Sequence, residues 1–187
     1  MMDKTYRTEL RRRFLIEALP HPLTRASSHL QFFDNYITGT RMRLRSMRDP
    51  GTKDWTWSLQ QRLVAERSGM NVLKIAEIHL NEEEHAVFEP FEGNEIRKNR
   101  YFHEFDGLAY DLDVFLGPLW GLNIASVRFD DEQAFLDMEP PSFAVFDVTN
   151  NPFFLGENLY EKKFEDIQLE VRRIADQRLG RPIDADE

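Results

Sequence analysis

An alternation of arginine with apolar residues constrains the fold of this chain more than any other feature of its sequence. Arg41, Arg43 and Arg45 alternate with Met42 and Leu44. Side chains of a β-strand point to opposite faces with a period of two, so the pattern predicts a strand with three guanidinium groups on one face. On a solvated surface, water and salt screen their repulsion. Inside a barrel or cleft they need an anionic partner, which is either a phosphate chain or a set of carboxylates.

Composition places the chain among soluble globular proteins. Its 187 residues are 41% hydrophobic and 30% charged, and 15 phenylalanines predict an aromatic-rich core. The chain has no long apolar run and no signal-peptide pattern, so we expect neither a membrane span nor secretion. The absence of cysteine excludes disulfides and thiolate chemistry and is typical of a cytoplasmic protein. We predict one domain over residues 1–180 and a disordered tail over 181–187.

Charge is distributed unevenly along the sequence. The net charge of −9 argues against broad binding to nucleic acid. Four arginines nevertheless fall within residues 7–13 and four more within 41–48, whereas acidic residues concentrate at 82–95, 104–113 and 130–139. Local cationic strands in an acidic protein favour a confined anion site. The alternative is that these strands form ordinary surface salt bridges.

The periodicity predicts an α+β fold dominated by short strands. Period-two patterns between turn signals predict strands at residues 5–16, 29–37, 40–47, 55–64, 72–80, 96–102, 109–116, 122–129 and 143–149. Helices are expected after Asn81, at 132–138 and at 159–179. Many short adjacent strands favour an antiparallel, roughly eight-stranded closed β-barrel with flanking helices, because closure removes the sheet edges.

Charged side chains of both signs recur at strand-face positions. The cationic candidates are Arg11, Arg13, Arg41, Arg43, Arg45, Lys98 and Arg100, and the acidic ones are Glu9, Asp111, Asp113 and Asp147. If these faces point inward, the barrel has a mostly cationic interior that binds a small polyanion, and the remaining carboxylates are available for Mg²⁺ or Mn²⁺. If they point outward, the barrel has the more common apolar core. No histidine pair with metal-ligand spacing, glycine-rich phosphate loop or nucleophile elbow is present.

Several segments, taken in order, resemble the CYTH superfamily of triphosphate tunnel metalloenzymes. Glu9-Leu10-Arg11-Arg12-Arg13-Phe14-Leu15 resembles the family's opening Glu-x-Glu-x-Lys-Phe-Leu strand. The other matching segments are His29-Leu30-Gln31, Asp34-Asn35-Tyr36-Ile37, Thr40 to Arg45, Ile96 to Tyr101, Asp113-Val114-Phe115, Asp147-Val148-Thr149 and Phe154 to Leu159. The resemblance covers about residues 6–160, and its strength lies in the order and spacing of the segments.

The resemblance implies a tunnel barrel that binds a triphosphate or another phosphorylated polyanion. By position, the phosphate contacts are Arg13, Arg41, Arg43, Lys98 and Arg100, and we add Arg11, Arg45 and Arg128 to this set. Glutamates of the family hold divalent metals that activate hydrolysis or cyclisation. Here Glu9 matches such a position, and Asp113 and Asp147 are the remaining metal-ligand candidates.

Departures from the family pattern affect mainly its acidic residues. Arg11 stands where the family has a second glutamate, and Ala125 to Arg128 stands where it usually has Ala-Glu-Val-Glu. Gln60 replaces a strand lysine. Because like charges about 4 Å apart repel by roughly 1 kcal/mol even in water, Arg11 and Arg128 oppose a divalent metal beside them. We therefore expect weak or absent metal binding.

Two interpretations of the new arginines remain open. In one, Arg11 and Arg128 replace the positive charge of the metal, so that a polyanion binds without it. In the other, they pair with Glu9, Asp113 or Asp147 and have no role in ligand binding. The corresponding functions are a polyanion-binding protein with reduced or no metal-dependent catalysis, an active metal-dependent triphosphatase with rearranged ligands, and a non-catalytic protein-interaction domain.

Overall fold

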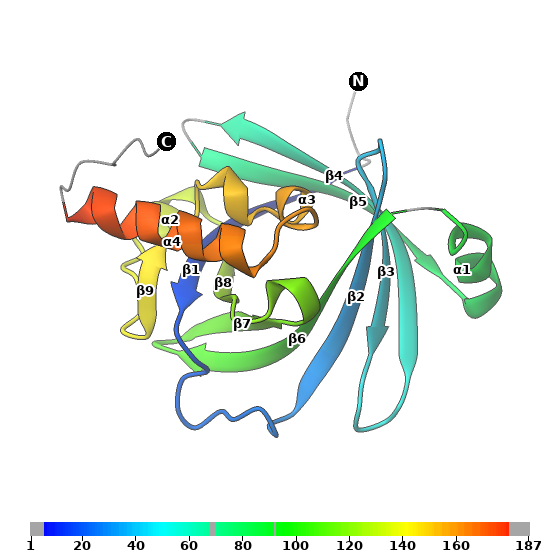
Figure 1. Ribbon diagram of the computed structural model, residues 1–187, viewed down its shortest axis with the longest axis horizontal. Coiled ribbons are helices and arrows are strands. Elements are labelled where there is room, and N and C mark those ends of the chain that lie inside the picture. Colours follow the sequence, from blue (N-terminus) through cyan, green and yellow to red (C-terminus); the bar gives the residue numbers. More distant parts are fainter. Residues whose placement is uncertain (1–5, 68–69, 92, 180–187) are drawn as a thin grey trace.

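An antiparallel sheet closes on itself in the computed structural model, which describes residues 6–67, 70–91 and 93–179 (Figure 1). The strands in this part of the chain are β1 (Arg7–Ile16), β2 (His29–Ile37), β3 (Met42–Arg48), β4 (Trp55–Arg67), β5 (Met70–Leu80), β6 (Gly93–Phe105), β7 (Leu108–Phe115), β8 (Asn123–Phe129) and β9 (Ala144–Asp147). Their order in the sheet is β5-β4-β3-β2-β6-β7-β8-β1-β9.

The barrel closes through β1, which changes partner along its length. Residues 7–10 of β1 pair with β5, and residues 10–15 pair with β8. Eight strands therefore complete the barrel, and β9 adds to β1 as a ninth strand through Phe14–Ile16. The predicted antiparallel barrel is confirmed. Closure gives each of these eight strands a partner strand on both sides, which is the physical advantage of a barrel over an open sheet.

Helices flank the barrel and follow the capping signals of the sequence. They are α1 (Glu82–Phe88), η1 (Gly117–Leu119), α2 (Glu132–Asp137), η2 (Pro152–Phe154), α3 (Gly156–Leu159) and α4 (Phe164–Arg178). Asn81 and Glu84 form a reciprocal capping box at the start of α1, and the Asp131 side chain caps α2. No helix in the described ranges has the length and apolar character needed to cross a bilayer.

Apolar packing lies outside the barrel wall and across one end of it. One buried cluster, which includes Phe14, Leu112 and Val127, takes alternate residues of β1, β7 and β8 and packs beneath the segment that carries Leu19 and Leu23. A second cluster joins barrel residues to η1, η2, α3 and α4. Because strand side chains alternate, these outward apolar positions leave the intervening polar positions facing the interior. The alternative of an apolar core with the charged faces outward is wrong.

Predicted element boundaries differ from the structure mainly next to turns. The strand expected from residue 40 begins at Met42, because the Thr38–Arg41 segment forms a turn in which Thr40 Oγ1 donates to the Ile37 carbonyl at 2.9 Å. The helix expected over 159–179 begins only at Phe164 as α4, and Leu159 is instead the last residue of the short helix α3. Part of the expected first strand and the expected tail over 181–187 lie outside the described residues.

Candidate functional site: a cationic tunnel

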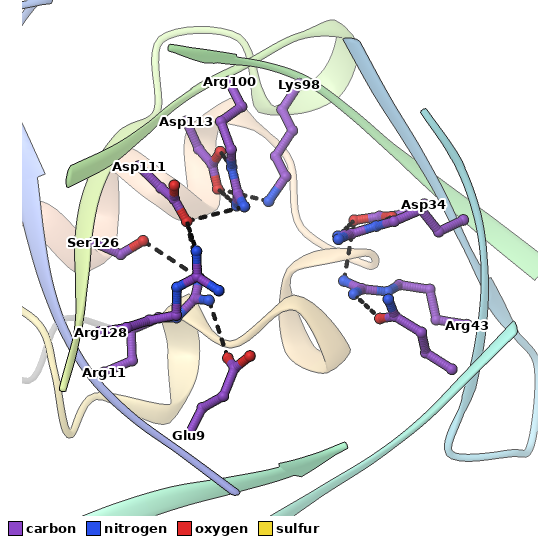
Figure 2. A network of polar contacts seen from close by, with 12 residues as sticks. Glu9, Arg11, Asp34, Arg43, Lys98, Arg100, Asp111, Asp113, Ser126 and Arg128 are labelled. Carbon is purple, nitrogen blue, oxygen red and sulfur yellow. Dashed lines mark hydrogen bonds and ion pairs between the residues drawn. The ribbon is translucent and has the colours of Figure 1, made fainter. Parts of the chain in front are cut away.

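A cavity of about 140 Å³ occupies the barrel interior, and charged side chains of the described residues line it from seven of the eight barrel strands (Figure 2). Among the described residues, its lining includes nine basic side chains and three acidic ones. The basic residues are Arg7, Arg11, Arg13, Arg43, Arg45, Arg62, Lys98, Arg100 and Arg128, and the acidic residues are Glu9, Asp34 and Asp113. A chain with a net charge of −9 therefore encloses a cationic tunnel.

Asp34 on β2 holds two arginines of β3. Arg45, its direct partner in the antiparallel register, donates through Nε and Nη2 to the two carboxylate oxygens at 2.6 and 2.7 Å. Arg43 Nη1 donates to Oδ2 at 3.1 Å. Burial raises the pKa of Asp34, but Arg43 and Arg45 outweigh burial and hold this pKa well below its usual range. Asp34 thus fixes both arginines in the tunnel wall.

Asp113 on β7 makes the corresponding cluster with two cations of β6. Arg100 donates to both of its oxygens at 2.7 and 2.8 Å, and Lys98 Nζ donates to Oδ2 at 2.6 Å. Burial lowers the pKa of Lys98 to about 7; the Asp113 charge raises this pKa and the nearby Arg100 charge lowers it, so burial is not offset. An additional anion in the tunnel would therefore favour the charged form of Lys98.

Arg11 on β1 is inserted among acidic and cationic groups of three strands. Its Nη2 donates to Glu9 Oε2 at 3.0 Å, and its Nη1 lies 3.4 Å from Ser126 Oγ and 3.9 Å from Asp111 Oδ2. Its buried Nε has no hydrogen-bond partner among the described residues. Burial and the Arg100 charge lower the pKa of Arg11 to about 10, and Glu9 offsets this only in part. Arg11 is therefore a cation whose charge is incompletely compensated.

Arg13 and Arg62 form a second group of undercompensated cations, near α3. The buried Arg13 Nη1 has no hydrogen-bond partner within the described ranges, and burial together with the Arg62 charge lowers the pKa of Arg13. Arg62 Nε lies 4.0 Å from Glu157 Oε2, too far for a hydrogen bond. These two atoms are also buried without a hydrogen-bond partner among the residues described. This part of the tunnel contains donors that are positioned but not engaged.

Gln60 on β4 links the Arg43 side of the tunnel to an acid on β5. Its carbonyl oxygen accepts a hydrogen bond from Arg43 Nη2, and its amide nitrogen donates to Glu77. Gln60 is 3% exposed. The neutral amide therefore serves as an internal connection where the family pattern has a lysine, and it adds no charge of its own to the tunnel.

Six of the eight predicted phosphate contacts lie well inside this network, and Arg128 lies at its margin. The first six are Arg11, Arg13, Arg43, Arg45, Lys98 and Arg100. The Arg128 side chain is 58% exposed and its Nη2 lies 3.9 Å from Asp111 Oδ2. Arg41 differs from the prediction: it is exposed, precedes β3 and does not line the tunnel. Because β3 begins only at Met42, after the turn, Arg41 does not share the tunnel-facing side of Arg43 and Arg45.

The structure does not bring the three predicted metal ligands together. Glu9 and Asp113 face the tunnel, whereas Asp147 lies on β9 outside it, where Asp147 Oδ2 accepts from Arg12 Nη2 at 2.6 Å. The reason is that β9 joins the barrel only through the outer pairing with β1. Sequence reasoning also left Asp34, Arg62, Glu77 and Glu157 out of the site. The strand alternation offered a signal for two of them. Asp34 shares its strand face with Tyr36, and Arg62 shares its strand face with Gln60, and all four residues line the tunnel.

Comparisons with known proteins agree with this geometry. No family model matches the chain. An inorganic triphosphatase of Acetivibrio thermocellus is 33% identical over 73 residues, which are 39% of this chain and 46% of that protein, so the match spans less than half of the relative. The crystal structure of the inorganic triphosphatase NE1496 superposes with a TM-score of 0.55 at 22% identity, covering 81% of this chain and 93% of that one. A second structure of NE1496 gives the same TM-score and covers 83% and 99% of the two chains.

The chain therefore shares the fold of the NE1496 triphosphatase structures, and its ordered strand motifs resemble those of the CYTH superfamily. The superfamily resemblance implies a divalent metal, and the residues of this tunnel do not fit one. Glu9 is paired with Arg7 and Arg11, and burial is outweighed by these charges, which lower the pKa of Glu9.

The other tunnel carboxylates are engaged in the same way. Asp113 is taken by Lys98 and Arg100, and Asp111 accepts from Arg100 Nη1 at 3.1 Å. Across the ranges that the structure describes, no three acidic or histidine side chains form a group able to hold a metal ion. The carboxylates of this tunnel therefore serve as counter-ions of arginine and lysine.

Proposed function

We propose that this protein belongs to the CYTH superfamily and binds a polyphosphate or phosphorylated polyanion in its tunnel, with little or no metal-dependent hydrolysis. The observation that carries the proposal is a group of buried guanidinium atoms that line the tunnel without a hydrogen-bond partner among the described residues: Arg11 Nε, Arg13 Nη1, Arg43 Nε and Arg62 Nε. A buried donor without an acceptor carries a desolvation penalty, and a phosphate oxygen removes that penalty while adding a charge-assisted hydrogen bond.

The charge balance supports an anion of several charges. Nine basic side chains line the tunnel, and six acidic ones face or contact them once Asp111, Glu77 and Glu157 are added to the lining acids. The described tunnel thus carries a surplus of three positive charges. The inorganic triphosphatase of A. thermocellus and the NE1496 structure support a triphosphate as the first ligand to test.

Calorimetric titration with tripolyphosphate tests the binding function. We expect binding by the wild-type protein and a loss of at least about tenfold in affinity for Arg13→Ala, because this variant removes a buried donor that the ligand engages. Arg97→Ala is the matched control, since Arg97 is adjacent to Lys98 on β6 but points outward with 60% of its side chain exposed. Failure of the wild-type protein to bind tripolyphosphate, pyrophosphate or ATP would refute the proposal.

An active metal-dependent triphosphatase is the second candidate, and the match to the A. thermocellus enzyme favours it. A colorimetric phosphate-release assay over tripolyphosphate and nucleoside triphosphates, with Mg²⁺ or Mn²⁺, separates the two functions. Under the binding proposal we expect no release above the level of an Arg13→Ala preparation. Release that requires the metal and disappears in Arg13→Ala would establish the enzyme instead.

A further inference from the structure

We infer that the guanidinium groups of Arg11 and Arg128 are built-in counter-cations of the ligand, so that the tunnel selects the metal-free form of its polyanion. This inference rests on the proposed binding function and specifies which form of the ligand binds. It differs from a mere loss of metal, because it assigns the two arginines a positive role in recognition and gives divalent cations an inhibitory effect.

The two arginines occupy the position where acidic side chains of two strands converge, Glu9 of β1 and Asp111 of β7. Arg11 of β1 and Arg128 of β8 are direct partners in the antiparallel register. Their Nη atoms both lie 3.9 Å from the same oxygen, Asp111 Oδ2, and Arg11 also contacts Glu9 at 3.0 Å (Figure 2). A divalent ion that bridges Glu9 and Asp111 would have to displace Arg11 from between them.

The surroundings keep Arg11 in this position as a cation. Ser126 Oγ lies 3.4 Å from its Nη1, and Glu9 and Asp111 supply negative charge on two sides. Its Nε remains buried without a partner among the described residues. A guanidinium presents several donors in a fixed plane that matches the geometry of phosphate oxygens. Arg11 therefore has a free donor for a ligand even while its outer nitrogens hold the carboxylates.

Arg128 supplies the second charge at a more accessible place. Its side chain is 58% exposed, in contrast to 16% for Arg11. Like charges directly opposite each other in a sheet repel, and an anion placed between them converts this repulsion into two attractions. The pair thus provides the two positive charges that a divalent ion would bring, and it provides them as part of the protein.

The effect of Mg²⁺ on ligand affinity should be opposite in this tunnel and in a tunnel that needs a metal. Polyphosphates in solution bind Mg²⁺, and the metal neutralises the charges that Arg11 and Arg128 recognise. A complexed ligand would also bring a dication against two guanidinium groups. Rising Mg²⁺ must therefore weaken binding to this tunnel, whereas it would strengthen binding to a tunnel that uses the metal as a bridge.

The test is calorimetric titration of the full chain with tripolyphosphate in EDTA and then at increasing Mg²⁺. We expect binding in EDTA and at least a tenfold loss of apparent affinity when Mg²⁺ exceeds the ligand. Arg11→Gln should weaken binding in EDTA at least tenfold and reduce the inhibition by Mg²⁺, while Arg97→Gln, on the outer face of β6, should behave as wild type. Circular dichroism establishes that each variant is folded.

These titrations distinguish failure of the binding function from failure of the counter-cation role of Arg11 and Arg128. Absence of binding in both conditions overturns the binding function itself. Binding only with Mg²⁺ leaves that function standing and overturns the inference, as does an Arg11→Gln protein that binds as tightly as wild type in EDTA. A double variant, Arg11→Glu with Arg128→Glu, provides an independent measurement: if it folds, we expect it to lose binding in EDTA, and retention of that binding contradicts the inference.

Discussion

Asp113 on β7 lies directly opposite Arg100 on β6 and accepts hydrogen bonds from both ends of its guanidinium group. The same carboxylate accepts from Lys98. One acid thus compensates two buried cations, as Asp34 does for Arg43 and Arg45 on the other side of the tunnel. The tunnel is an arrangement in which carboxylates hold cations in place and leave part of the positive charge for a ligand.

Asp113→Asn should destabilise the fold strongly. Removing one partner of a buried ion pair leaves an uncompensated charge, which typically costs about 3–5 kcal/mol of unfolding free energy. Denaturant unfolding measures the loss. Asp147→Asn is the control, since Asp147 pairs with Arg12 outside the barrel with 35% of its side chain exposed, and it should cost about 1 kcal/mol or less. Equal losses in the two variants would contradict the assignment of Asp113 as a structural counter-ion.

Binding of tripolyphosphate should depend on pH through Lys98. Burial lowers the pKa of this amine to about 7, and a bound anion raises it again, so binding takes up a proton above pH 7. Affinity should be nearly constant below pH 7 and fall above it by up to about tenfold per pH unit. Lys98→Arg stays charged throughout and should flatten the profile. An unchanged slope in Lys98→Arg would assign the titration to another group or to the ligand.

Glu157→Gln should increase the affinity for a polyanion. Glu157 Oε2 lies 4.0 Å from Arg62 Nε and competes with the ligand for the Arg13 and Arg62 charges. Even at the dielectric constant of bulk water, a charge about 4 Å away is worth about 1 kcal/mol, so we expect a gain of at least roughly fivefold in affinity. Glu165→Gln, at an exposed position of α4, is the control. Weaker binding by Glu157→Gln would show instead that Glu157 helps to orient Arg62 for the ligand.

Gly156→Ala should disturb the junction between α3 and the barrel. A Cβ at this position would overlap the Tyr36 hydroxyl, which in turn accepts a hydrogen bond from Arg43 at 3.2 Å. Overpacking of this kind costs about 1–3 kcal/mol, which thermal unfolding detects. Tyr36→Phe combined with Gly156→Ala should recover part of the loss, because the overlapping oxygen is gone. A stable single variant with unchanged ligand affinity would mean that α3 can shift away freely.

The alternation of charged and apolar residues determined which side chains share a face. It placed Arg43 with Arg45, and Lys98 with Arg100, because strand geometry has a period of two regardless of context. It failed at Arg41, where a local turn stops the strand, and at Asp147, whose strand pairs outside the barrel. The order of the motifs further predicted the closed antiparallel barrel.

Only the tertiary structure decided which way the charged faces point and which ions meet. The same alternation fits an apolar core or a cationic tunnel, and the choice depends on whether loops, helices and β9 cover the apolar positions from outside. The approach of Glu157 to Arg62, and of Arg128 and Arg11 to Asp111, joins residues far apart in sequence. Such contacts depend on the curvature and stagger of a closed sheet, which a periodic pattern in one strand does not encode.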